Sequence, residues 1–148
     1  MKQTSPKERR KRKYRQISHT ADLGWRIRGE SLEEIFANAA AALTATITDR
    51  RNLRIRETRE ITIEAPDREA LLVAWLNYLL YLNDIDGFLG RDFDILHLTP
   101  ERLSAQAKGE IFDPSRHVGK TAVKAATYHH LEIKPQDHGW LATVILDL

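Results

Sequence analysis

Apolar residues recur at helical spacing in two segments of the chain. In residues 31–47 they form a single stripe that begins after Ser31, and Glu34 follows three residues later, as in a capping box. In residues 68–83, directly after Asp67, apolar residues occur nearly all round the helix. The first pattern predicts a helix with one buried face, and the second predicts a central helix that is covered on more than one side.

Alternation of apolar and polar residues, which is typical of a half-buried strand, marks other segments. The clearest is Leu23–Arg28, whereas Trp140–Leu146 is apolar on both faces and is therefore expected at the centre of a sheet. Further strands are predicted at 14–18, 52–65, 92–98, 102–112 and 124–133, and loops at 84–90 and 113–121. Because the strands come in runs and do not alternate one for one with helices, we predict an α+β fold with two principal helices and a mainly antiparallel sheet.

Charge divides the chain into two parts. The formal net charge is +2 over 148 residues. Residues 1–15 hold eight Lys or Arg residues against one Glu, a net +7, so the remaining chain is −5. We expect residues 1–13 to be a basic disordered tail and residues 14–148 to form one folded domain. The acidic charge of that domain disfavours nucleic-acid binding by the folded part, although the tail could touch RNA weakly.

Composition also bears on the compartment. The chain has no cysteine, which removes disulfides and thiolate metal sites and fits a reducing compartment. Its charged start is not followed by the apolar segment of a secretory signal. The longest uncharged run, residues 70–83, is too short to span a bilayer. We therefore expect a cytoplasmic protein that does not enter the membrane.

Two histidine-containing motifs invite a chemical interpretation. The segment His117–Ala122, HVGKTA, ends like a phosphate-binding loop, but Pro114 stands where that motif needs a glycine. We interpret it as a flexible basic loop that could dock an acidic partner. His129 and His130 are adjacent in a predicted strand, so we expect them to point to opposite faces and to be structural.

Three aspartates stand at the ends of predicted elements. Asp22 closes the sequence HTAD, which begins at His19 and has too few ligands for a zinc site. Asp49 follows the first helix, where the helix dipole disfavours a negative charge. Asp147 ends the buried last strand, where an unpaired charge is costly. Together the three could hold a hard cation, or each could pair with a nearby Arg or Lys, with Asp22 bound to turn amides.

The sequence resembles the archease family. The matching segments occur in the family's order and cover most of the chain from about residue 17 to residue 148: HTADLGWRIRGESLEEIFANAAAAL, ITD, LLVAWLNYLLY, KGEIFD, VKAATYHHLEI and WLATVILDL. The resemblance implies an α+β fold in which one strand-helix-strand-strand module is embedded in another. It also implies a non-catalytic function in tRNA splicing. Archeases activate the manganese- and GTP-dependent RNA-splicing ligase, helping it to form its guanylylated histidine and to turn over repeatedly.

The resemblance further implies a site, an acidic metal-binding cluster with a lysine nearby. Carried over by motif, the metal-binding residues are Asp22, Asp147 and Asp49, and the lysine is Lys124. His19 matches the motif and is expected to orient Asp22. The implied cofactor is a divalent metal ion (calcium, magnesium or manganese). The implied partner is the RNA-splicing ligase, through which the protein would contact tRNA indirectly.

Two other functions remain open from the residues alone. A small metal-dependent hydrolase could use the same carboxylates, but no constellation of nucleophile and base is evident. A module that binds a small molecule or nucleic acid above the sheet is disfavoured in its nucleic-acid form by the acidic domain. Lys124 could likewise be an ordinary solvated lysine. The sequence does not indicate an oligomeric state.

Overall fold

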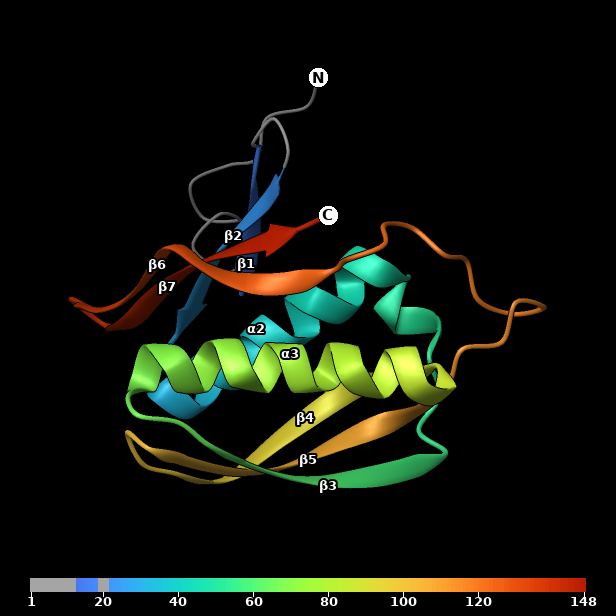
Figure 1. The fold of residues 1–148 in the computed structure, drawn as a ribbon, viewed down its shortest axis with the longest axis horizontal. Coiled ribbons are helices and arrows are strands. Elements are labelled where there is room, and N and C mark those ends of the chain that lie inside the picture. The colour runs from blue at the N-terminus through green and yellow to red at the C-terminus, as the bar shows by residue number, and fades with distance from the viewer. Residues whose placement is uncertain (1–12, 19–21) are drawn as a thin grey trace.

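Two antiparallel sheets enclose a layer of helices (Figure 1). The computed structural model describes residues 13–18 and 22–148. The first sheet, in the order β1-β2-β7-β6, consists of β1 (Tyr14–Ser18), β2 (Asp22–Gly29), β7 (Gly139–Asp147) and β6 (Ala125–Gln136). The second, in the order β3-β5-β4, consists of β3 (Glu57–Glu64), β5 (Arg102–Ile111) and β4 (Phe88–Leu98). The helices are α2 (Leu32–Ile47), α3 (Arg68–Asp86) and the short 3-10 helix η1 (Arg50–Asn52).

The order of elements along the chain shows how the two sheets are related. The segment from β3 through α3, β4 and β5 forms the second sheet and lies in the chain between α2 and β6. The first sheet is therefore assembled from both ends of the described chain. One strand-helix-strand-strand unit is inserted into another, formed by β2, α2, β6 and β7. The predicted α+β fold is confirmed, and the strands divide into two sheets.

Side-chain caps fix where the helices begin. Ser31 Oγ accepts the Glu34 N–H at 3.2 Å, as predicted for the start of α2. Glu34 in turn accepts the N–H of Glu30 at 2.6 Å, one residue before the position of a standard capping box. Asp67 Oδ1 caps α3 by accepting the N–H of Ala70 at 2.8 Å. Both helices therefore start where the sequence predicts.

Helix α3 is the centre of the core and lies between the sheets (Figure 1). Its residues Leu72, Trp75 and Leu76 are fully buried, and the Trp75 indole N–H donates to the Phe36 carbonyl of α2 at 3.0 Å. Each such side chain contributes about 1.5–3 kcal/mol by leaving water. This confirms the prediction of a helix covered on more than one side. Within the described part of the chain, no helix is long and apolar enough to cross a membrane.

The predicted loop at 84–90 is wrong. Helix α3 continues to Asp86, and β4 begins at Phe88, so Gly87 alone reverses the chain. Gly87 adopts a left-handed conformation with φ of 81°, and its N–H donates to the Asn83 carbonyl at 2.8 Å. A glycine tolerates this backbone without strain, which is why one residue replaces a longer loop.

The predicted strand at 52–65 begins too early. Residues up to Asn52 form η1, and β3 starts only at Glu57. In the intervening segment the N–H of Arg54 donates to the Glu110 carboxylate at 2.6 Å. A side chain thus replaces the ladder partner that a strand would need, and periodicity alone does not reveal such a contact.

The expectation that His129 and His130 point to opposite faces is also wrong. The β6–β7 register passes from Thr127 opposite Ile145 directly to Glu132 opposite Thr143, so residues 128–131 form a bulge. Within it His130 has φ of 53°, and the two imidazole centroids lie 4.0 Å apart. Extra residues in a bulged strand break the alternation of side chains.

The loop after β5 closes over the end of α2. The N–H groups of Lys120 and Thr121 donate to the carbonyls of Ile47 and Thr46 at 2.8 and 3.1 Å. These carbonyls have no partner within the helix, so the loop satisfies them. A phosphate-binding loop would keep such amides free for phosphate, and the structure therefore agrees with the rejection of that motif.

A buried carboxylate anchors this loop. Glu110 is 3% exposed, and it accepts hydrogen bonds from the Arg54 N–H, the Arg116 guanidinium and His117 Nε2. His117 Nδ1 accepts the N–H of Asp113 at 2.8 Å, which assigns the ring hydrogen to Nε2. Burial acts to raise the pKa of Glu110, but the hydrogen bonds outweigh it and lower that pKa from 4.5 to about 2.

This network predicts a pH-dependent stability. A carboxylate with a lowered pKa contributes stability above its unfolded pKa of 4.5, and the contribution is lost as the pH falls from there towards 2. At pH 7, Glu110→Gln should lower the free energy of unfolding by about 1–3 kcal/mol, because it leaves buried donors poorly matched. The measurement is urea unfolding at a series of pH values.

The difference in free energy of unfolding between wild type and Glu110→Gln should become smaller below pH 4.5. Glu64→Gln serves as the control, because Glu64 is exposed and pairs with Arg102 at the surface; it should change stability by less than about 1 kcal/mol. A Glu110→Gln effect that is the same at every pH would contradict the assignment of an ionised Glu110.

Candidate metal-binding site

Two of the predicted metal ligands lie opposite each other on neighbouring strands of the first sheet. The β2–β7 register sets Asp22 opposite Asp147, and the β6–β7 register sets Ala125 on the other side of Asp147. Directly opposed residues in antiparallel strands have Cα atoms about 4.5–5.5 Å apart and side chains on the same face. The fold thus brings together two carboxylates that are more than a hundred residues apart in sequence.

The packing of β2 explains which way Asp22 points. Leu23, Trp25 and Ile27 face the helices, where the Trp25 indole N–H donates to Thr46 Oγ1 of α2 at 3.0 Å. Side chains in a strand alternate between faces, so Asp22 points to the other face of the sheet. A slip of one residue would exchange the two faces and bury the carboxylate against α2.

The electrostatics of this pair favour a cation. Like charges directly opposite each other in a sheet are destabilising. Both aspartates are partly buried, and neither has an ion-pair partner among the residues that the structure describes. Carboxylate oxygens are the ligands that calcium, magnesium and manganese prefer. A divalent ion between the two carboxylates would replace their repulsion with attraction.

Lys124 lies at the same end of the sheet. Its backbone N–H donates to the Asp147 carbonyl at 2.8 Å, and its side chain is exposed. It immediately precedes β6, whereas the sequence predicted it as the first residue of that strand. An exposed positive side chain on a flexible stem therefore belongs to the same end of the sheet as the two carboxylates.

Asp49 is engaged elsewhere. Its carboxylate accepts the N–H of Arg51 at 3.2 Å and lies 3.4 Å from both Arg51 Nε and Asn52 Nδ2. It thus caps η1 and pairs with a neighbouring arginine, which is the alternative left open from the sequence. Over residues 13–18 and 22–148, no group of three or more His, Cys, Asp or Glu side chains is placed to hold a metal. His19 lies outside the described residues.

Two protein carboxylates leave a hard cation incompletely coordinated. Calcium takes six to eight oxygen ligands, and magnesium takes an octahedron that usually retains several waters. The pair formed by Asp22 and Asp147 could supply only part of either shell. Such a site can bind an ion and still present open positions to a phosphate or to a second protein.

Sequence reasoning missed a second polar cluster, in which the guanidinium groups of Arg56 and Arg116 approach the buried Glu110. One signal was available, since residues 50–59 hold five arginines against one glutamate. The burial of Glu110 had no such signal. Its strand directs Leu103, Ala105 and Ala107 inward, and the returning loop is what covers it.

Comparisons with known sequences agree on one family. Residues 14–148 match the model of the Archease protein family. The archease of Methanosarcina barkeri is 38% identical over 141 residues, which are 93% of this chain and 97% of the relative. The archease of Pyrococcus abyssi is 39% identical over 141 residues, which are 93% of this chain and 99% of the relative.

Solved structures agree with these matches. The solution structure of Methanobacterium thermoautotrophicum protein 1598 is similar with a TM-score of 0.79 and 34% identity, and the match covers 92% of this chain and 99% of that one. The crystal structure of a Thermotoga maritima archease, described as a possible chaperone, has a TM-score of 0.61 at 21% identity over 89% of this chain and 94% of its own, a likeness of fold alone. The chain, with its nested strand-helix-strand-strand units and its facing aspartates, belongs to the archease family.

Proposed function

We propose that this protein activates the RNA-splicing ligase of tRNA splicing by presenting a divalent metal ion held between Asp22 and Asp147. The observation that carries the proposal is the register of β2 and β7, which sets two acidic side chains opposite each other without a described cationic partner. Membership of the archease family supports the same function.

The residues fit a calcium, magnesium or manganese ion. Asp22 and Asp147 would hold it through their oxygens, and the open coordination positions would face the partner. When bound, such an ion stabilises negative charge on phosphoryl oxygens. Lys124 is exposed at the same end of the sheet, where its ammonium group can meet a phosphate of the ligase's nucleotide.

In this proposal the protein is an accessory and not the catalyst. The ligase guanylylates its own histidine and joins the RNA ends, while this chain contributes charge and ion binding at the surface of the complex. The description of the Thermotoga maritima relative as a possible chaperone fits an accessory role. The proposal includes a cytoplasmic location and contact with the ligase through the acidic end of the first sheet.

A metal titration tests the site without the ligase. Wild-type protein stripped of metal should bind one calcium, magnesium or manganese ion, measured by isothermal titration calorimetry. Asp22→Asn and Asp147→Asn should each weaken that binding at least about tenfold, since each removes one of two charged ligands. In the absence of metal, both variants should be more stable than wild type by about 0.2–1 kcal/mol, because a like-charge pair is removed.

Two other aspartates serve as controls for the titration. Asp94→Asn changes an exposed residue that pairs with Lys108, and Asp49→Asn changes the cap of η1. Both should retain wild-type affinity. Equal loss of affinity in the Asp94 and Asp22 variants would show only diffuse attraction to an acidic surface and would rule out the site.

A ligation assay tests the function. The assay contains GTP, manganese and a limiting amount of ligase. The amount of ligated RNA per ligase molecule is measured with and without this protein. Asp22→Ala and Asp147→Ala should abolish stimulation, and Lys124→Ala should reduce it. Deletion of residues 1–13 should have little effect, because these residues lie outside the part of the sequence that matches the archease family. Circular dichroism verifies that each variant is folded, and full stimulation by a folded Asp22→Ala, Asp147→Ala double variant would remove the carboxylates from the mechanism.

A further inference from the structure

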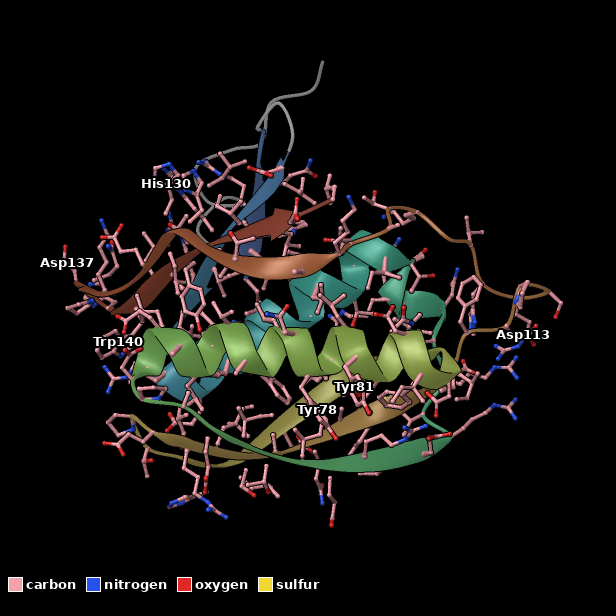
Figure 2. The ribbon with its side chains drawn as sticks, in the orientation of Figure 1. Tyr78, Tyr81, Asp113, His130, Asp137 and Trp140 are labelled. Atoms are coloured by element: carbon pink, nitrogen blue, oxygen red, sulfur yellow. The ribbon has the colours of Figure 1, made fainter. Side chains whose placement is uncertain are left out.

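Basic side chains gather at one end of the molecule, around the start of β3 and the loop after β5. Figure 2 shows this end beside the label for Asp113, away from the β6–β7 turn at Asp137. We define the arginine surface as Arg51, Arg54, Arg56 and Arg116. The net charge of the folded domain hides this surface, because residues 50–59 alone carry a net +4 within an acidic whole.

Buried Glu110 contacts two of these arginines, Arg56 and Arg116, through their guanidinium groups, and Arg54 through its backbone N–H. Its carboxylate oxygen Oε1 lies 3.5 Å from Arg56 Nε and also contacts the Arg116 guanidinium, while Oε2 accepts the backbone N–H of Arg54. The N–H of Arg56 donates to the Gly109 carbonyl at 2.9 Å. The guanidinium groups of Arg56 and Arg116 and the backbone of residues 54–56 are therefore ordered before any ligand binds. This order reduces the entropy lost on binding.

The arginine surface is partly neutralised, because Arg51 pairs with Asp49 and Arg116 pairs with Asp113 as well as with Glu110. A guanidinium carries five N–H donors, and the Nε of Arg56 lies 3.5 Å from the Glu110 carboxylate. The side chains of Arg51 and Arg56 are 89% and 59% exposed. Arg54 is exposed and has no ion-pair partner within the described part of the chain. The surface can therefore bind anionic oxygens.

Apolar groups lie among these charges. An open cleft of about 390 Å³ here is lined by two arginines, three acidic residues and three apolar residues: Arg56, Arg116, Glu57, Glu110, Asp113, Ile111, Phe112 and Pro114. Ile111 is 39% exposed, and Ile55, between two of the arginines, is 48% exposed. A surface that combines cations with accessible apolar side chains suits a flexible polyanion with unstacked bases better than a duplex, whose bases are covered.

We propose that the arginine surface binds the phosphodiester backbone of single-stranded RNA directly. Arginine rather than lysine provides the charge, and its planar fork matches phosphate oxygens in pairs. The choice of RNA over DNA rests on the proposed function, which acts on RNA ends. The proposal replaces the expectation that RNA is contacted only through the ligase, and it locates that contact on elements other than those that hold Asp22 and Asp147.

Direct binding is measured by fluorescence anisotropy with a fluorescein-labelled single-stranded RNA and full-length protein, without ligase. Because the N-terminal tail also attracts RNA, the background is a full-length chain in which Arg9, Arg10, Lys11, Arg12 and Lys13 are changed to Gln. In that background, Arg51→Gln combined with Arg54→Gln should weaken binding about tenfold. It should also reduce the slope of log Kd against log salt by about 1.4, the value for two lost phosphate contacts on a single strand.

The matched control removes the same charge elsewhere. Arg102→Gln combined with Lys134→Gln changes two exposed cations, at the start of β5 and in β6. This pair should change affinity less than about twofold. Equal weakening by both pairs, or loss of all binding when the tail is neutralised, would overturn the proposal.

Competitors identify the ligand class. Unlabelled RNA should displace the probe at lower concentration than polyglutamate of equal charge. Displacement by polyglutamate at the same concentration would indicate an acidic protein partner and overturn the assignment to nucleic acid, and equal displacement by DNA of the same sequence would overturn the assignment to RNA. Since the assay contains no ligase and leaves Asp22 and Asp147 intact, its failure is distinguishable from failure of the ligase proposal.

Discussion

The pairing of β2 with β7 is the constraint on which the rest of the structure depends. These strands come from the two ends of the described chain, and their pairing closes the outer strand-helix-strand-strand unit around the inserted one. The register is fixed from the helical side, where Trp25 and Val144 face each other and lie in or against the core. Packing of these apolar side chains therefore determines that Asp22 meets Asp147 on the opposite face. Apolar packing occupies one face of the sheet, and the two carboxylates lie on the other.

A second constraint, the burial of Glu110, links the arginine surface to the end of the first sheet that carries Asp147. Its hydrogen bonds hold His117 and Arg116, so the chain after β5 folds back over the molecule. The same loop caps α2 through Lys120 and then enters β6 beside Asp147. Removing one partner from a buried charged network is costly. The loop is consequently fixed at both ends. Its first end, at Arg116 and His117, contributes to the arginine surface, and its second end, at Lys120, leads to Lys124.

Periodicity and caps predict much of this fold, and tertiary contacts explain where they fail. The stripe after Ser31 and the all-round apolar pattern after Asp67 locate both helices, because helix packing depends on local spacing. The same reasoning fails at Gly87, where one left-handed residue replaces a loop, and at Arg54, whose N–H bonds to a distant carboxylate. For the candidate site, sequence could nominate Asp22 and Asp147 individually, but their mutual register is a property of the folded sheet.

The acidic pair and the arginine surface would interact differently with the RNA strand that we propose as a ligand. A phosphate backbone is repelled by the bare acidic pair and attracted by the arginines around Glu110. A divalent ion held by Asp22 and Asp147 would cancel the repulsion at that end and leave the attraction at the other unchanged. Binding of the ion would therefore change where a strand can lie on the protein, as well as complete a coordination shell. In this arrangement the net charge of the domain has little influence, because interactions beyond about one Debye length of roughly 8–10 Å are screened and each surface acts locally.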